Sequence, residues 1–400
     1  MKARGCVTAG IVATLVTLMA GHFRTTPYNN YVLLADALLH GHVWIAWPGA
    51  YIDALAYRGQ HYVIEGPVPA LLLLPYVAIV GTAANQTLLS AVLCGIAVGA
   101  AWELGERLGV ARSANVWLCA FLLAGTDLLW CAMLGDVWFI AHVSAAAFTL
   151  LALVELCGKR RGWLVALWAV AAAGSRFSLV LAIPVYVLMF IAADSHSQHW
   201  RVDPARLRAA LLGLGGVLVG AGALYIAYNF ARWGTAADIG YTSWYHQDAA
   251  GSPTGSPFRL QYLSYQLWSF FVQRPDFSRV FPWIRPSYSG IALTWTSPAL
   301  VFALWAPFSK LKATFRERAL VFAMWSAALV VAVPSLVYYV NGFAQYGMRH
   351  ALDFIPFLYV LMVLAARIRL PLWMKALIVY SCVSSLYGVW YWNAVLRSGN

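Results

Sequence analysis

Apolar runs of bilayer length recur along the whole chain, and short polar intervals separate them. Such runs are typical of transmembrane helices, because about 20 residues of helix cross the hydrocarbon core of a membrane. No long polar interval interrupts the pattern, so we expect residues 1–400 to form a single membrane-embedded, all-α domain. About 11 spans are predicted, with approximate limits 7–22, 86–104, 114–131, 138–156, 163–174, 178–193, 209–230, 290–307, 319–340, 352–366 and 373–392.

Composition supports this class. Hydrophobic residues make up 62% of the chain and charged residues only 10%, against about 25% charged residues in soluble domains. A net charge of +12 would suggest nucleic acid as the partner of a soluble protein. Here the basic residues lie in short loops between the apolar runs, so membrane topology explains the charge and no nucleic acid is expected.

The distribution of charge predicts the topology. With the N-terminus in the cytoplasm, every lysine and most arginines face the cytoplasm, whereas most carboxylates face the other side. This arrangement requires that the apolar segment 67–81 does not cross the membrane. As a helix it would be about 22 Å long, too short for a core of about 30 Å, so we expect it to lie at the interface or to re-enter. The first span resembles a signal peptide but lacks a clear cleavage site, and we expect an uncleaved anchor.

Two extracytoplasmic loops, 21–85 and 231–289, are long enough to build a site. In the first, apolar residues at helical spacing predict an amphipathic helix over 31–40, which Gly41 can end. In the second, aromatic residues recur at three- and four-residue steps with arginines beside them. We expect both loops to follow the membrane interface; membrane anchoring alone would also explain their aromatic residues.

Carboxylates near the outer rim of a hydrophobic bundle are costly unless they are solvated, paired or functional. Asp36, Asp53, Glu65 and Asp136 are such residues, and His142 follows Asp136 by less than two helical turns. We expect them to form one acidic pocket. The alternative is that each is solvated or paired with a nearby arginine.

Other kinds of chemistry find little support in the sequence. The six cysteines lie in or beside apolar runs without a CxxC pair, so neither disulfides nor a structural zinc site is expected. His40, His42 and His61 form a weak metal candidate, because Gly41 separates the first two and no thiol joins them. Nucleophile-elbow, P-loop and HExxH patterns do not occur in a suitable context.

The order of elements resembles the GT-C glycosyltransferases, in particular bacterial relatives of the protein O-mannosyltransferases and of the lipid A aminoarabinose transferases. The resemblance rests on one anchor helix before a long external loop, the helix that ends at Gly41, and an apolar helix that starts at Pro67-Val-Pro69. Later segments fit the same order. They are Ser175-Arg176-Phe177, Tyr228 to Gly234 and Gln345 to His350.

The resemblance implies a bacterial inner-membrane enzyme that moves a sugar from a polyprenyl-phosphate donor to an extracytoplasmic acceptor. In such enzymes an early acidic residue of the first loop serves as the base. The relatives commonly begin that loop with an Asp-Glu pair, whereas residues 25–30 of this chain contain no carboxylate. Either Asp53, which we favour slightly because it lies in a loop, or Asp36 has taken over, or the fold is kept without transfer chemistry.

Further roles follow from the same resemblance. The leaving phosphate needs cations, which are either arginines or a divalent metal such as Mg or Mn. If a metal is present, Asp136 with Asp53 or Asp36 would hold it. The residues expected to bind substrate or phosphate are Arg176, Arg349, His350, Asp136, His142 and Glu65.

Two other functions remain open from the sequence. A transporter or flippase of a lipid-linked or amphipathic substrate would also use membrane carboxylates and helix-breaking prolines. Against this reading, the acids gather at one rim and the chain shows no internal repeat. A non-catalytic GT-C-fold protein of envelope assembly is the third possibility.

Overall fold

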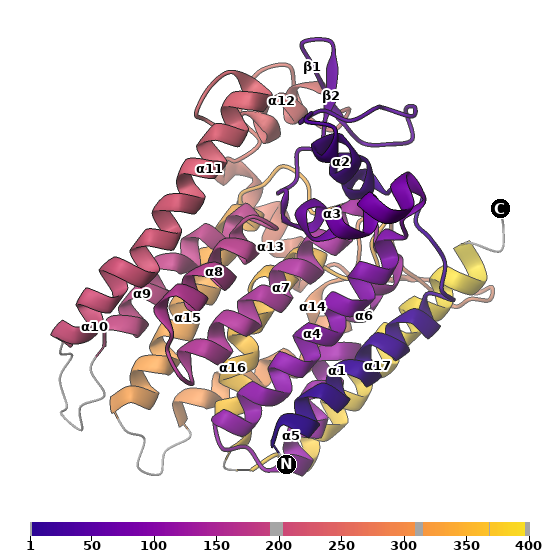
Figure 1. Cartoon of the computed structure of the whole chain (residues 1–400). Helices are drawn as coiled ribbons and strands as arrows, with labels where there is room; N and C mark the ends of the chain where they lie inside the picture. Colours follow the sequence, from indigo (N-terminus) through magenta and orange to yellow (C-terminus); the bar gives the residue numbers. More distant parts are fainter. Residues whose placement is uncertain (1, 193–202, 309–314, 368, 397–400) are drawn as a thin grey trace.

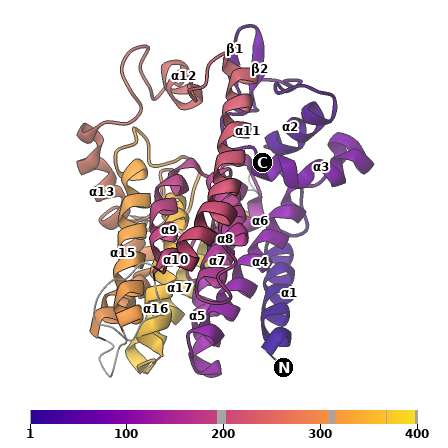
Figure 2. The same cartoon turned by 60° about the vertical axis from the view of Figure 1, so that its left-hand side comes forward.

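The computed structural model describes residues 2–192, 203–308, 315–367 and 369–396. These residues form a predominantly helical bundle with two small β-hairpins in its loops. The N-terminus lies at one end of the bundle, and the long loops gather at the opposite end (Figures 1 and 2). We call these the N-terminal end and the loop end.

Five helical stretches are long and apolar enough to cross a membrane, and a bent pair makes a sixth candidate. Each coincides with a span expected from the sequence. The bent pair turns by 49° and consists of α5 (Arg112–Ala124) and α6 (Leu128–Leu134). Three of the five are single helices: α4 (Gln86–Arg107), α7 (Val137–Leu156) and α15 (Phe315–Leu336). The fourth is the continuous stretch of α10 (Pro204–Ala209), η3 (Ala210–Leu214) and α11 (Gly215–Trp233), and the fifth is α17 (Leu372–Tyr391) with η7 (Trp392–Leu396).

The other five expected spans are helical but shorter. They pack beside the long helices in the same bundle (Figures 1 and 2). α7 lies at the centre of the bundle, since 89% of its most apolar 18-residue segment is buried by other parts of the protein. The shorter helices are α1 (Lys2–Ala20), α8 (Gly162–Ala173), η2 (Phe177–Ala182) with α9 (Ile183–Ile191), η5 (Pro298–Phe308) and α16 (Ile355–Ala366).

The first loop forms most of a cap at the loop end (Figure 1). The helix expected over 31–40 is present as α2 (Asn30–Leu39), and Gly41 follows it with φ +78°, a conformation that suits glycine. A hairpin of β1 (Leu55–Tyr57) and β2 (Gln60–Tyr62) follows, which the apolar pattern did not predict. The segment 67–81 gives α3 (Val68–Val80), whose 13 residues are too few for a span, and then η1 (Gly81–Ala83).

The second loop and the last connections complete this end. Their elements are α12 (Gly240–Gln247), η4 (Leu260–Tyr262), α13 (Leu263–Phe271), the hairpin of β3 (Asp276–Phe277) and β4 (Ile284–Arg285), α14 (Leu293–Thr296) and η6 (Arg349–Asp353). The turn η6 leads directly into α16, so its side chains stand where the cap meets the bundle.

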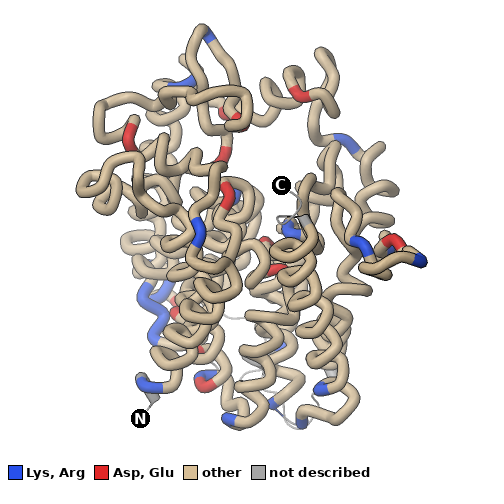
Figure 3. The backbone as a smooth tube through the Cα atoms, turned by 90° about the vertical axis from the view of Figure 1, so that its right-hand side faces the viewer, with Lys and Arg blue, Asp and Glu red and all other residues tan. Residues whose placement is uncertain are grey.

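Charge is distributed unevenly between the two ends. Lys and Arg line the turns of the N-terminal end and also occur at the loop end, whereas most Asp and Glu lie toward the loop end (Figure 3). Arg201, Lys310 and Lys312, which belong to loops expected on the cytoplasmic side, lie outside the described residues. The basic turns between α4 and α5 and between α7 and α8 lie at the same end of the bundle, as the sequence pattern predicts.

Candidate functional site

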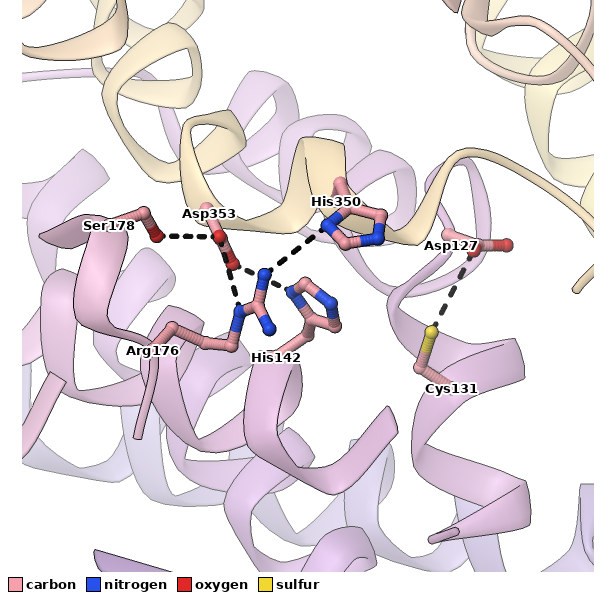
Figure 4. A network of polar contacts seen from close by, with 7 residues as sticks. All are labelled: Asp127, Cys131, His142, Arg176, Ser178, His350 and Asp353. Carbon is pink, nitrogen blue, oxygen red and sulfur yellow. Dashed lines mark hydrogen bonds and ion pairs between the residues drawn. The ribbon is translucent and has the colours of Figure 1, made fainter. Parts of the chain in front are cut away.

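A buried group of charged side chains lies where η6 meets α7 and the turn between α8 and η2 (Figure 4). Asp353 is at its centre. One carboxylate oxygen is 2.7 Å from Nδ1 of His142, and the other accepts hydrogen bonds from Ser178 at 2.7 Å and from Nε of Arg176 at 3.3 Å. A carboxylate in this position compensates the buried Arg176 charge and fixes the direction of the guanidinium.

His350 extends the group on the far side of Arg176. Its Nδ1 lies 3.2 Å from a guanidinium nitrogen of Arg176, and its ring lies 5.1 Å from that of His142. Arginine can only donate, so Nδ1 of His350 accepts and the imidazole is neutral. Burial and the nearby cation Arg176 both hold the pKa of His350 well below its usual value. The site therefore contains a neutral base next to a fixed positive charge.

Arg349 supplies a second cation. Its guanidinium donates to the carbonyl of Phe343 at 3.0 Å and lies over the ring of Phe139, while its Nε has no partner among the described residues. Asp127, at the bend between α5 and α6, accepts the backbone N–H of Gly347 at 3.2 Å. A Cβ on Gly347 would lie 2.9 Å from that carboxylate oxygen, so glycine permits the close contact that holds the Arg349 loop.

The first loop brings Glu65 to this group. Gly66 packs so closely on the turn after α8 that an added Cβ would lie 2.1 Å from the carbonyl oxygen of Gly174, and Val68 donates its backbone N–H to that oxygen at 3.1 Å. Glu65 is therefore held against the segment that carries Arg176. It is 7% exposed, and its Oε2 has no partner among the residues that the structure describes.

Burial raises the pKa of Glu65 to about 7. Asp53 acts in the same direction, while Arg176 and Arg349 oppose it. A carboxyl group with this pKa is divided between its acid and base forms near neutral pH, which is the condition that favours general acid-base catalysis.

Tyrosine hydroxyls lie within electrostatic range of Glu65 and Arg176. Tyr31 is fully buried, and its hydroxyl has no partner within the described part of the chain. Its pKa is raised mainly by burial and then by Glu65. Tyr241, from the second loop, is influenced by burial, Arg176 and Glu65, and its pKa is also raised. The unsatisfied oxygens of Tyr31 and Glu65 are groups that a polar substrate or water would satisfy.

The residues expected to act as the base occupy different surroundings. Asp53 is half-buried, its pKa is raised by burial and by Asp248, and it acts electrostatically on Glu65. Asp36 lies on α2 with a 34% exposed side chain, 3.8 Å from His40. Its described contacts do not reach the group around Asp353.

Asp136 begins α7 and accepts a hydrogen bond from Thr26, which ties the first loop to that helix. Among the described residues, no group of three or more His, Cys, Asp and Glu side chains is arranged to hold a metal ion. Because Asp136 is engaged by Thr26 and Asp36 lies beside His40, the donor set considered for Mg or Mn does not fit a shared ion.

Asp353, Ser178 and Tyr31 are the members of the site that the sequence analysis did not assign. Asp353 follows His350 by three residues and precedes an apolar run, so its closeness to an expected site residue could have pointed to it as a member of the site. Ser178 and Tyr31 carry no comparable signal, because hydroxyls beside apolar helices are common.

Comparisons of this chain with protein-family models, curated proteins and solved structures found no match.

Proposed function

We propose that this protein is a membrane glycosyltransferase of the GT-C type, which moves a sugar from a polyprenyl-phosphate donor to a hydroxyl-bearing acceptor. The observation that carries the proposal is Glu65: a buried carboxyl with a pKa of about 7, one oxygen that has no partner among the described residues, and two arginines in electrostatic range. Base and cations at one buried site suit a reaction that removes a proton and releases a phosphate.

In the proposed reaction, Glu65 takes the proton of the acceptor hydroxyl. The acceptor oxygen then forms a bond to the anomeric carbon of the sugar as the bond from that carbon to the phosphate oxygen breaks. The electron pair of the broken bond leaves with the polyprenyl phosphate. Arg176 and Arg349 stabilise the developing negative charge, because guanidinium groups bind phosphate oxygens with paired donors.

The remaining site residues orient these groups. Asp353 holds Arg176 and His142 in place through the contacts described above, and Asp127 holds the Arg349 loop. The negative charge of Asp53 helps to keep the pKa of Glu65 high. Asp36 is partly exposed beside His40, so it is not assigned this role.

The proposed topology of the chain in the membrane is as follows. Six long spans and five shorter helices would together give 11 crossings, with the N-terminus in the cytoplasm and the loop end outside a bacterial inner membrane. An odd number of crossings agrees with α1 starting at the N-terminal end and α17 ending toward the loop end (Figure 1). The basic N-terminal end agrees with a cytoplasmic position.

The test is a transfer assay in which purified protein receives a radiolabelled polyprenyl-phosphate sugar and membrane lipid acceptors. Glu65→Gln is expected to lower kcat by 10²- to 10⁴-fold, the usual contribution of a general base. Asp36→Asn serves as the matched control and should keep wild-type turnover. Normal turnover by Glu65→Gln would remove Glu65 as the base, and loss of turnover in Asp53→Asn alone would move the role to Asp53.

The same materials separate transfer from transport. In sealed proteoliposomes, a transferase alters the donor by forming a new glycosidic bond, and polyprenyl phosphate accumulates. A carrier would move the labelled donor across the bilayer without changing it chemically. Movement of intact donor with no product in either leaflet would refute the proposed function.

A further inference from the structure

A buried arginine near the end of α11 joins the two long loops. The guanidinium of Arg232 donates to the carbonyl of Val63 in the first loop at 3.4 Å, and it pairs with the carboxylate of Asp238 in the second loop at 3.4 Å. It also lies over the ring of Tyr228, 4.1 Å from the ring centre. A buried charge depends on such partners, so this contact fixes both loops relative to α11.

Asp238 extends this contact to the start of α12. One carboxylate oxygen accepts from Arg232, and the other accepts the backbone N–H of Gly240 at 2.9 Å. A Cβ added to Gly240 would lie 3.7 Å from the Cβ of Ile64, which directly precedes Glu65. Figures 1 and 2 both show α12 beside the β1–β2 hairpin of the first loop. The start of α12 therefore packs on the segment that carries Glu65.

Tyr241 is the next residue of α12, and it lies at the buried charged group. Its ring centre is 6.2 Å from that of Tyr338. The ring of Tyr338 lies in turn 6.4 Å from that of His350, which contacts Arg176. Arg176 and Glu65 both act electrostatically on the Tyr241 hydroxyl. The second loop thus adds a side chain to the site that η6, α7 and the first loop build.

Two hydrogen-bond donors at this point have no acceptor within the described part of the chain. The hydroxyl of Tyr241 makes no hydrogen bond there, and this side chain is only half-buried. In Arg176, Nε contacts Asp353 and one terminal nitrogen contacts His350, which leaves the other terminal nitrogen without an acceptor. The Arg176 side chain is 15% exposed, and neither donor atom is fully enclosed by the protein. Burial raises the pKa of Tyr241, so its hydroxyl keeps the proton that it can donate.

We propose that Tyr241 is a further substrate-contacting residue, which together with Arg176 donates hydrogen bonds to the phosphate of the lipid-linked donor. This role rests on the proposed function, because the phosphate belongs to its donor substrate. A phosphate offers several acceptor oxygens and a negative charge, which one neutral and one charged donor can bind together. The pair of Arg232 and Asp238 positions Tyr241, since it holds the start of α12 against the first loop.

Binding of radiolabelled farnesyl phosphate to the immobilised full chain in detergent tests this role. Farnesol, which lacks the phosphate, and inorganic phosphate, which lacks the prenyl chain, serve as competitors. In wild type, both competitors should displace the probe far less well than unlabelled farnesyl phosphate does. Tyr241→Phe should weaken binding of farnesyl phosphate by about 10- to 100-fold, because it removes one hydrogen bond to a charged group. Wild-type affinity in this variant would overturn the proposal, as would equal competition by farnesol or by inorganic phosphate.

A matched control lies on the same helix. Tyr245→Phe removes a hydroxyl that contacts the hydroxyl of Tyr262 at 3.3 Å, and it should leave the affinity for farnesyl phosphate unchanged. Asp238→Asn tests the positioning role. Its loss of affinity should not add to that of Tyr241→Phe in the double variant, because both changes act through one hydroxyl. Additive losses would show that Asp238 does not act through Tyr241.

The binding and transfer assays separate this role from the proposed function. If wild type transfers sugar and Tyr241→Phe binds farnesyl phosphate normally, only the role of Tyr241 is refuted. If binding requires both the phosphate and Tyr241 but no sugar is transferred, the transfer function is refuted and the phosphate site stands.

Discussion

Glu65→Gln is expected to change how the stability of the protein depends on pH. The carboxyl group is buried within electrostatic range of Arg176, one of its oxygens has no partner among the described residues, and burial raises its pKa from 4.5 to about 7. Between these two values the folded state binds more protons than the unfolded state. Stability is therefore greatest below about pH 4.5 and falls as the pH rises through about 7.

The size of this effect follows from the two pKa values. Each tenfold change in a protonation equilibrium is worth about 1.4 kcal/mol, so the difference between 4.5 and about 7 corresponds to about 3 kcal/mol. Glutamine has the shape of the protonated acid but does not ionise. The variant should equal wild type at about pH 4.5 and exceed it by up to about 3 kcal/mol above pH 8.

Reversible unfolding in detergent, followed by tryptophan fluorescence at several pH values, measures this difference. Glu103→Gln is the control, because Glu103 pairs with Arg107 near the surface with both side chains 26% exposed. Such a pair is worth at most about 1 kcal/mol. If the stability of Glu65→Gln falls with pH as steeply as that of wild type, Glu65 does not carry the proton and the proposed base loses its physical support.

Three further substitutions test the construction of the site and the bundle. Asp353→Asn should cost about 3 to 5 kcal/mol of unfolding free energy in the same assay, because it leaves the Arg176 charge buried without its carboxylate; a loss below about 1 kcal/mol would mean that water already solvates the arginine. Gly66→Ala should destabilise by about 1 to 3 kcal/mol and increase proteolysis of the first loop, since the new Cβ overlaps the Gly174 carbonyl. Gly216→Ala, on the open side of α11, should instead raise the thermal midpoint through about 1 kcal/mol of helix propensity, and a lowered midpoint would reveal a close neighbour there.

The site was only partly predictable, and particular residues show why. Glu65 and His142 were expected near one rim because charged residues between apolar runs have few positions available, whereas Arg176, Arg349 and His350 were expected at the site from the family resemblance. The sequence does not show which of these side chains contact one another. Asp353 became the centre of the group only when η6 placed it 2.7 Å from His142, a residue 211 positions earlier in the chain.

The sequence by itself determined the class of the protein. The length of its apolar runs, the separation of basic and acidic loops, and the shortness of segment 67–81 reflect local chemistry that any fold of this chain must respect. The pattern therefore located the helices of the bundle, including six that are long enough, alone or as a bent pair, to cross a membrane.

Tertiary structure alone decided which carboxylate is buried and which is solvated. Asp36, Asp53 and Glu65 are all carboxylates of the first loop, but the packing of Gly66 on Gly174 brings Glu65 within electrostatic range of Arg176, whereas α2 leaves Asp36 partly exposed beside His40. Desolvation depends on neighbours that are distant along the chain, so no local pattern encodes it. That difference in burial is why Glu65 is the acid that we propose as the base.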